Sequence, residues 1–264
     1  MAEPGTPSVV SILADPTHEA RITVDQAFAA TYRRNLDWLL DRLSKSTAGV
    51  RGLIADTPRL KALSLAEAEE TPQLSPTIVA IIAQAYARYF RASFTDPGAF
   101  VGFDARFLSR EFGEIFTRVF AGSGLRVVRD HNSEPTPTPV TSFMALLLGL
   151  SGGIQITASH NPPNHNGVKS STCYGGVDTD DISDRIAEQV RSLLAEGGAI
   201  TFAALPSPLV REVDAKGLYA REYLRATFPP EALEPLRRAI EGNAGFLFDG
   251  LHGVGGMAMR QYLD

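Results

Sequence analysis

The sequence has few of the residues that build disulfide or metal frameworks: its 264 residues include one cysteine, Cys173, and five histidines. A single cysteine excludes an internal disulfide and a cysteine-rich zinc site, so we expect a reducing, cytoplasmic compartment. An excess of positive charge is also missing, because the net charge is −5. A surface that binds nucleic acid needs clustered Lys and Arg, so we expect no nucleic-acid partner.

Long apolar runs are missing as well. The longest candidate, FMALLLGL at 143–150, is far shorter than the roughly 18 apolar residues of a membrane span, so we expect no membrane partner. The first residues, MAEPGTPS, lack the basic start and apolar block of a signal peptide. The 44% hydrophobic and 21% charged residues that the chain does contain are typical of a globular protein with a large core.

Apolar periodicity predicts strands that alternate with helices through the middle of the chain. We expect helices at 75–92 (capped by Ser75), 110–124 (capped by Ser109), 138–150 and 180–198, and strands at 99–104, 125–130 and 153–159. One amphipathic helix is expected before them, at 24–43. This alternation indicates an α/β fold, with a mainly parallel mixed sheet and helices on both faces.

The last part of the chain predicts a second, incomplete α/β unit. After a polar connection at 199–213 we expect helices over 217–228 and 230–240 and a strand, AGFLFDG, at 244–250. A unit with one strand has not closed its sheet, so we expect a chain that is cut short. The expected organisation is an N-terminal extension (1–45), a first domain (46–200) and the start of a second domain (201–264).

The stretch TASHNPPNHNGVK (157–169) interrupts a buried apolar run with polar residues. Ser159 ends an expected strand, and the two prolines after it favour a stiff, exposed loop. Gly167 is expected to turn the chain back, so that Lys169 reaches the same space. From the residues alone, Ser159 is a nucleophile, a phosphate carrier stabilised by cations, or a turn serine that only bonds the backbone.

This stretch resembles, almost letter for letter, the active-site serine loop of the α-D-phosphohexomutases, T-A/G-S-H-N-P followed by N-G-x-K. Three more stretches agree in order. STAGVRG (46–52) resembles G-T-S-G-x-R-G, with Ser46 and Ala48 as substitutions, and VGFDARFLS (101–109) resembles V-G-x-D-x-R-x-S. FDGLHGVGG (248–256) resembles the D-x-x-H-G-x-G segment of the family's second domain, so the resemblance covers about residues 46–256.

The resemblance implies an intramolecular phosphotransferase that interconverts sugar 1-phosphates and 6-phosphates through a phosphoserine and a bisphosphate intermediate. Ser159 is the implied phosphoserine. The implied acid–base or phosphate-stabilising groups are His160, Lys169 and Arg51. The residues expected to shape the loop or touch the substrate are Asn161, Asn166, Gly167, Asp104 and Arg106, of which the last two are expected to form an ion pair.

The resemblance also implies a hexose phosphate substrate, Mg²⁺ and an activator of the glucose 1,6-bisphosphate type. The family's magnesium-binding loop, D-G-D-x-D-R, is missing from the sequence, so the phosphate on Ser159 is the one expected metal ligand. The pair His160 and His165 offers too few ligands for zinc. We therefore expect this chain alone to be nearly inactive, and to self-associate or to bind a complementing C-terminal fragment.

Two alternatives come from other functional classes. The altered stretch at 46–52 favours a non-catalytic module that binds sugar phosphates, or half of a split enzyme. A serine hydrolase that uses Ser159 and His160 is disfavoured, since adjacent side chains on an extended loop point apart and the G-x-S-x-G pattern is missing.

Overall fold

The computed structural model describes residues 7–45, 49–56, 63–245 and 247–263, so Ser46 and Ala48 lie outside the described residues. Its largest sheet has six strands in the order β2–β6–β5–β3–β4–β8. The strands are β2 (Val50–Leu53), β3 (Gly98–Phe103), β4 (Arg126–Asp130), β5 (Gly152–Ile156), β6 (His165–Thr172) and β8 (Val210–Val213). β5, β3, β4 and β8 run parallel, whereas β6 is antiparallel to both β5 and β2. The expected mainly parallel mixed sheet is confirmed.

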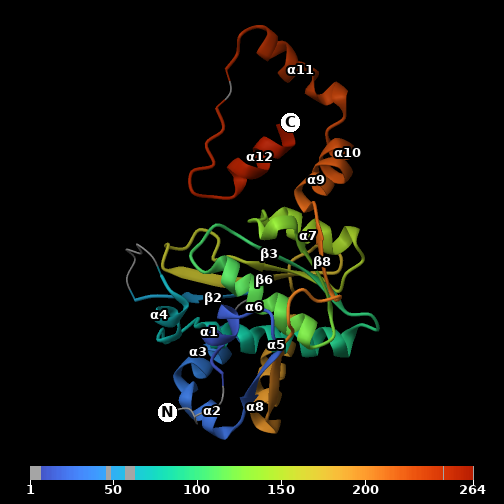
Figure 1. Cartoon of the computed structure of the whole chain (residues 1–264). Coiled ribbons are helices and arrows are strands. Elements are labelled where there is room, and N and C mark those ends of the chain that lie inside the picture. Colours follow the sequence, from blue (N-terminus) through green and yellow to red (C-terminus); the bar gives the residue numbers. More distant parts are fainter. Residues whose placement is uncertain (1–6, 46–48, 57–62, 246, 264) are drawn as a thin grey trace.

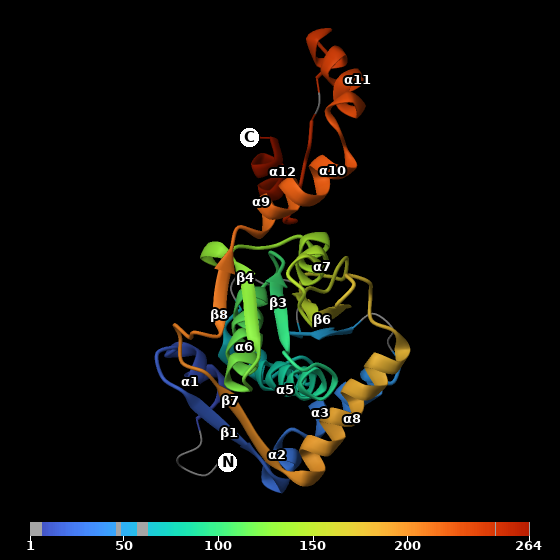
Figure 2. The same ribbon diagram turned by 90° about the vertical axis from the view of Figure 1, so that its right-hand side faces the viewer.

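Helices cover both faces of this sheet (Figures 1 and 2). α5 (Pro76–Ser93), α6 (Ser109–Gly122) and α8 (Asp180–Glu196) lie on one side, and α7 (Thr138–Leu147) packs on the other. Strand alternation supplies both cores: Ala99 and Val101 join the large core of α5 and α6, whereas Phe100 joins the smaller core under α7. Among the described residues, every helix is too short or too polar to cross a lipid bilayer.

The single helix expected at 24–43 is wrong. The structure has β1 (Ala20–Val24), α2 (Gln26–Thr31) and α3 (Arg33–Leu43), preceded by α1 (Val9–Ala14). Asp25 caps α2 by accepting a hydrogen bond from the backbone N–H of Phe28, and Tyr32 leaves helical geometry at φ −98° and ψ 14°. The helix is therefore interrupted at Tyr32. Short α4 (Leu65–Glu69) follows β2 in the chain.

The polar connection expected at 199–213 contains two strands. β7 (Gly198–Phe202) pairs antiparallel with β1 as a separate ribbon, and β8 extends the main sheet beyond β4. Alternation in β7 buries Ile200 and Phe202 in the large core, together with Ile22 and Val24 of β1. The prolines of this stretch lie between the two strands, and so do not prevent them.

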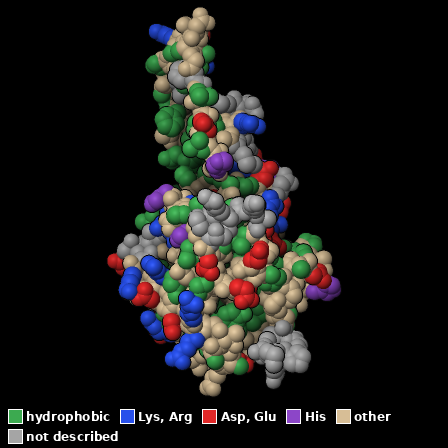
Figure 3. All heavy atoms as spheres, turned by 90° about the vertical axis from the view of Figure 1, so that its left-hand side faces the viewer, with side chains coloured by type: hydrophobic (Ala, Val, Ile, Leu, Met, Phe, Trp, Pro, Cys, Tyr) green, Lys and Arg blue, Asp and Glu red, His purple; other side chains and the backbone are tan. Residues whose placement is uncertain are grey.

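The C-terminal segment stands out from the body of the molecule (Figures 1 and 3). Its helical elements are α9 (Ala215–Tyr219), a π-helical turn (Ala220–Leu224), α10 (Arg225–Thr227), α11 (Pro230–Glu241) and α12 (Gly255–Leu263). The prediction of a strand at 244–250 is wrong, because the described residues of this stretch have irregular structure. No described strand lies beside this stretch to accept its hydrogen bonds, and Leu247 is 95% exposed. Other hydrophobic side chains also lie at the surface of the segment (Figure 3).

Candidate active site

The Ser159 loop leaves the carboxyl end of β5, where a parallel sheet presents its functional groups. Ser159 has a left-handed backbone, with φ of 57°, and its N–H donates to the Thr157 hydroxyl at 2.8 Å. A tight turn follows, in which the N–H of Asn161 donates to the Ala158 carbonyl at 3.1 Å. Both Ser159 and His160 are exposed. The loop thus holds a serine hydroxyl in solvent at the end of the sheet.

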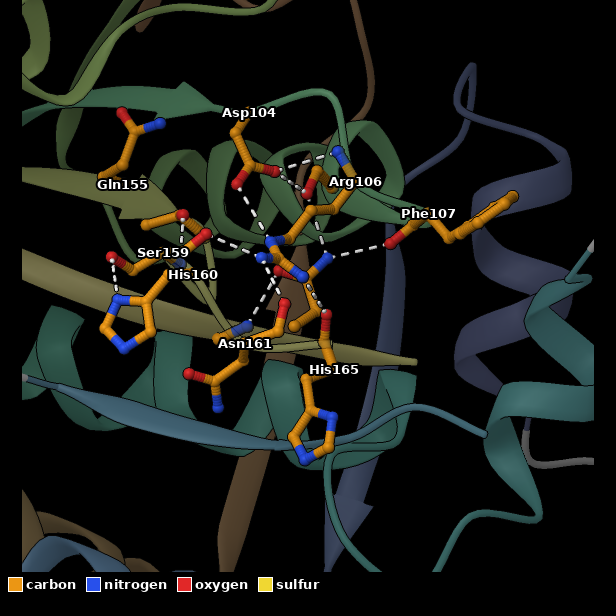
Figure 4. A network of polar contacts seen from close by, with 12 residues as sticks. Asp104, Arg106, Phe107, Gln155, Ser159, His160, Asn161 and His165 are labelled. Atoms are coloured by element: carbon orange, nitrogen blue, oxygen red, sulfur yellow. Dashed lines mark hydrogen bonds and ion pairs between the residues drawn. The ribbon is translucent and has the colours of Figure 1, made fainter. Parts of the chain in front are cut away.

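Arg106 holds the backbone of this loop (Figure 4). Its guanidinium donates to the carbonyl oxygens of Ser159 at 2.6 Å and Asn161 at 2.8 Å. It also donates to the carbonyl oxygens of Pro162 at 3.0 Å and His165 at 3.2 Å. One planar side chain therefore ties together both ends of the loop, which suits the fixed fork of donors on an arginine.

Asp104 fixes Arg106 in turn. Its carboxylate accepts from the backbone N–H of Arg106 at 3.0 Å and forms an ion pair with the guanidinium at 3.4 Å. It also accepts from the Ser109 hydroxyl at 2.7 Å. The expectation that Ser109 caps α6 is wrong, because Ser109 is the first residue of the helix and the preceding leucine occupies the N-cap position. The buried Asn166 donates to the Phe107 carbonyl at 2.8 Å and to the Ser109 hydroxyl at 2.9 Å, so it connects β6 to the same segment.

His160 lies closer to Ser159 than the sequence indicates. Its Nδ1 is 3.4 Å from the Ser159 Oγ (Figure 4). The expectation that the two side chains point apart is wrong, because the backbone at Ser159 is left-handed and not extended. Among the described residues, no carboxylate forms a hydrogen bond or ion pair with His160, so the third member of a hydrolase triad is missing.

A pocket of about 640 Å³ opens beside Ser159. It is lined by Asp104, Ala105, Arg106, Phe107, Ser159, Asn161, Pro163, His252 and Gly253. His252 and Gly253 belong to the FDGLHGVGG stretch, so a motif distant in sequence forms part of the wall. Neither was among the expected site residues; the resemblance of that stretch was the signal that points to them.

Gly167, Lys169 and Arg51 lie on strands rather than on the loop. Gly167 pairs with Arg51 of β2, and Lys169 pairs with Gln155 of β5. The expectation that Gly167 turns the chain back is therefore wrong, because this glycine lies within a strand. Burial lowers the pKa of Lys169 below its ordinary value, and the positive charge of Arg51 lowers it further. The two cations are thus within electrostatic reach of each other. Neither lines the Ser159 pocket.

The surroundings of Ser159 do not fit a magnesium site of their own. Within the described residues, one group of His, Cys, Asp and Glu side chains has ligand atoms within 4.8 Å of one another: Asp130, His131 and Asp214. There the buried ammonium of Lys216 already forms an ion pair with Asp130. None of these residues lines the Ser159 pocket. The Nδ1 of His165 lies 3.0 Å from the Asn164 Oδ1, so this ring nitrogen has a protein partner.

Comparison with known proteins places this arrangement in a family. The description "Phosphoglucomutase/phosphomannomutase, alpha/beta/alpha domain I" matches residues 43–196, which is more than half of the chain. The chain belongs to the phosphoglucomutase/phosphomannomutase family. The members of this family are isomerases, and the matched region contains β2 to β6, Arg106 and the whole Ser159 loop.

Matches to individual proteins agree with this family assignment. Phosphoglucomutases of Staphylococcus saprophyticus (32% identical over 152 residues) and Staphylococcus aureus strain bovine RF122 (31% over 157 residues) each match 57–58% of this chain. The chain spans only 25–26% of the length of these relatives. A solved structure from Thermus thermophilus, described as a phosphomannomutase, is 29% identical with a TM-score of 0.53, covering 72% of this chain and 37% of its own. Parafusin of Paramecium, a phosphoglucomutase in its open form, shares the fold (TM-score 0.64, 19% identity, 84% and 41% covered).

Proposed function

We propose that Ser159 is the phosphoryl carrier of a hexose-phosphate mutase, an intramolecular phosphotransferase that interconverts sugar 1-phosphates and 6-phosphates. The observation that carries this proposal is the exposed Ser159 hydroxyl beside a pocket of about 640 Å³, on a loop whose backbone Arg106 fixes. Phosphoryl transfer depends on in-line positioning more than on covalent help from the protein, so a fixed loop supports this chemistry.

In the proposed first half-reaction, a hydroxyl oxygen of the sugar monophosphate attacks the phosphorus of phospho-Ser159. The new O–P bond forms while the bond from phosphorus to the Ser159 Oγ breaks, and the proton of the sugar hydroxyl passes through the acid–base group to the Ser159 Oγ. In the second half-reaction, the Ser159 Oγ attacks the other phosphoryl group of the bisphosphate. The bond from that phosphorus to the sugar oxygen breaks, and the serine proton passes to this oxygen as the product leaves. His160 is the proposed acid–base group, since its Nδ1 lies 3.4 Å from the Ser159 Oγ.

Arg51 and Lys169 are proposed to stabilise phosphate charge through their field. The positive charge of Arg51 acts on Lys169 at the β2–β6 side of the loop, which supports a shared cationic environment. Asn161, Asn166, Gly167, Asp104 and Arg106 are proposed to shape the loop. In the family a magnesium ion neutralises phosphate charge; because this chain's residues do not fit that ion, we assign no step to it here.

We infer that this chain alone has little turnover, acts in the cytoplasm, and takes a hexose phosphate and a glucose 1,6-bisphosphate-type activator. The low turnover follows from the poor fit for a metal: with Ser159 as the single ligand, charge on the transferring oxygens is stabilised only by cationic side chains. A coupled assay from glucose 1-phosphate to glucose 6-phosphate tests this inference. Robust turnover by the purified chain would refute it.

Mass spectrometry tests the phosphoryl carrier itself. The purified chain is incubated with glucose 1,6-bisphosphate and its peptides are mapped, with Ser159→Ala as the control. We expect one added phosphoryl group, on Ser159, and none in the variant. Absence of a labelled Ser159 under every condition, or equal labelling of the variant, contradicts the proposal.

A further inference from the structure

A second pocket, of about 370 Å³, lies on the other side of the Ser159 loop. It is lined by Arg42, Lys45, Gly49, Arg51, Gly52, Leu53, Gln73, Asn161 and His165. Asn161 is the residue that it shares with the Ser159 pocket, so the two cavities are neighbours across the loop. In Figure 4 the side chains of Asn161 and His165 point away from Asp104, on the opposite side of the Arg106 guanidinium.

The charge of this second pocket has one sign. Arg42 lies in the last turn of α3, Lys45 follows the end of that helix, and Arg51 comes from β2. Among the described residues, no Asp or Glu lines the cavity. Lys45 has an ion pair with Asp41, but both side chains are at least half exposed, and such pairs stabilise little. For Arg42 and Arg51, the described part of the chain supplies no carboxylate within ion-pair distance. Three cations therefore converge on this hollow, and two of them, Arg42 and Arg51, have no carboxylate partner among the described residues.

One donor of a residue that lines this pocket also has no partner. The Arg51 Nε is buried, and no acceptor lies within hydrogen-bond distance of it among the described residues. Buried donors are normally hydrogen-bonded, so the neighbours of Arg51 in the described part of the chain leave part of its hydrogen-bonding capacity unused. The side-chain amide of Asn161 and the imidazole of His165 add polar groups to the same wall. These are the groups that recognise the oxygens of a phosphate.

We propose that this second pocket, which we call the cationic pocket, binds a phosphate group, with Arg42, Lys45 and Arg51 as its charged ligands. The shared chemistry is that of inorganic phosphate and of a phosphate monoester. The proposal rests on the proposed function only in that a sugar phosphate is the expected source of that group. Arg42 and Lys45 precede the stretches that resemble the family, so α3 would add a phosphate contact outside those motifs.

Phosphate binding is measured in the chain that carries Ser159→Ala, so that phosphorylation of Ser159 contributes nothing. Inorganic phosphate, glucose 6-phosphate and glucose are titrated by calorimetry. We expect both phosphates to bind and glucose not to bind. In the same background, Arg42→Gln with Lys45→Gln should weaken phosphate binding about tenfold or more, because two positive charges and their hydrogen bonds to the phosphate oxygens are lost.

The matched control is Arg33→Gln with Arg34→Gln, which removes the same two charges from the exposed start of α3, outside the pocket. We expect wild-type affinity for this control. Histidine NMR signals then locate the ligand: phosphate in the cationic pocket shifts the ring of His165, whereas phosphate in the Ser159 pocket shifts that of His252. No saturable phosphate binding, equal loss in both double variants, or a shift at His252 alone overturns the proposal. Labelling of Ser159 is measured separately, so failure here leaves the phosphoryl-carrier result readable.

Discussion

Replacement of Arg106 by methionine removes the donors that hold the Ser159 loop while keeping a long side chain. Its hydrogen bonds to the carbonyls of Ser159 and Pro162 are exposed, so water can replace them. Those to Asn161 and His165 are partly buried and are lost with less compensation. At about 1.5 kcal/mol for each partly buried bond to a charged group, we expect the free energy of unfolding to fall by about 3 kcal/mol.

Urea unfolding followed by circular dichroism measures this loss, with Arg91→Met as the matched control. Arg91 is exposed in the last turn of α5, so its replacement should change stability by less than about 0.5 kcal/mol. Arg106→Lys should recover only part of the loss, because one ammonium does not match the fork that reaches four carbonyls.

Hydrogen exchange separates a loop effect from a general loss of stability. The amides of Ser159, Asn161 and His165 donate within the loop. In Arg106→Met we expect the exchange rates of these amides to rise above their wild-type values by more than those of the β3 amides do. We also expect Ser159 to be phosphorylated more slowly in the variant than in the wild type. A variant with wild-type unfolding and unchanged exchange at these amides would show that Arg106 does not hold the loop.

Two more perturbations test the β2–β6 edge and the cluster at β4. A Cβ on Gly167 would lie 2.6 Å from the Val50 carbonyl oxygen and 2.7 Å from that of Thr157, so Gly167→Ala should lower the free energy of unfolding by about 1–3 kcal/mol. The control Gly176→Ala changes an exposed glycine and should leave the free energy of unfolding unchanged. Equal urea midpoints for the two variants would contradict this prediction. The hydrogen bond from Lys216 lowers the pKa of Glu134 below its ordinary value of 4.5. This carboxylate therefore contributes stability above pH 4.5 that is lost as pH falls through the lowered pKa. Glu134→Gln should flatten that part of the curve of unfolding free energy against pH, and an unchanged slope would refute this prediction.

The periodicity of apolar residues in the sequence was sufficient to predict the layers of helices and strands in the fold. The helix capped by Ser75 and the strands around Phe100 and Ile154 all have strong local signals, because each is apolar along a repeat that matches its final environment. The helix expected at 24–43 failed for a local reason that periodicity does not register. The same apolar spacing fits one helix or two, and only the turn at Tyr32 and the cap at Asp25 decide between them.

β6 shows a different limit. The polar sequence of His165–Thr172 has weak strand character, yet it lies between β5 and β2 and forms a ladder with each. Its backbone pairing comes from neighbours distant in the chain, so no short window of sequence reveals it. This is also why Gly167 was expected to turn: a glycine that only allows two other backbones to approach closely looks the same in sequence as a glycine in a turn.

The candidate site was partly predictable because its motifs meet through adjacent strands. β3 and β5 are neighbours, so the residues after each, Asp104 with Arg106 and Ser159, emerge at the same edge of the sheet. What the sequence did not contain was the direction of each side chain. Arg106 points into the Ser159 loop, which gives the V-G-x-D-x-R-like stretch a reason to accompany the serine motif: without its guanidinium, four carbonyls of a loop with two prolines have no common donor. We therefore expect the two stretches to act as one unit, and the cationic pocket on the far side of the loop to depend on the same arginine for the position of Asn161 and His165.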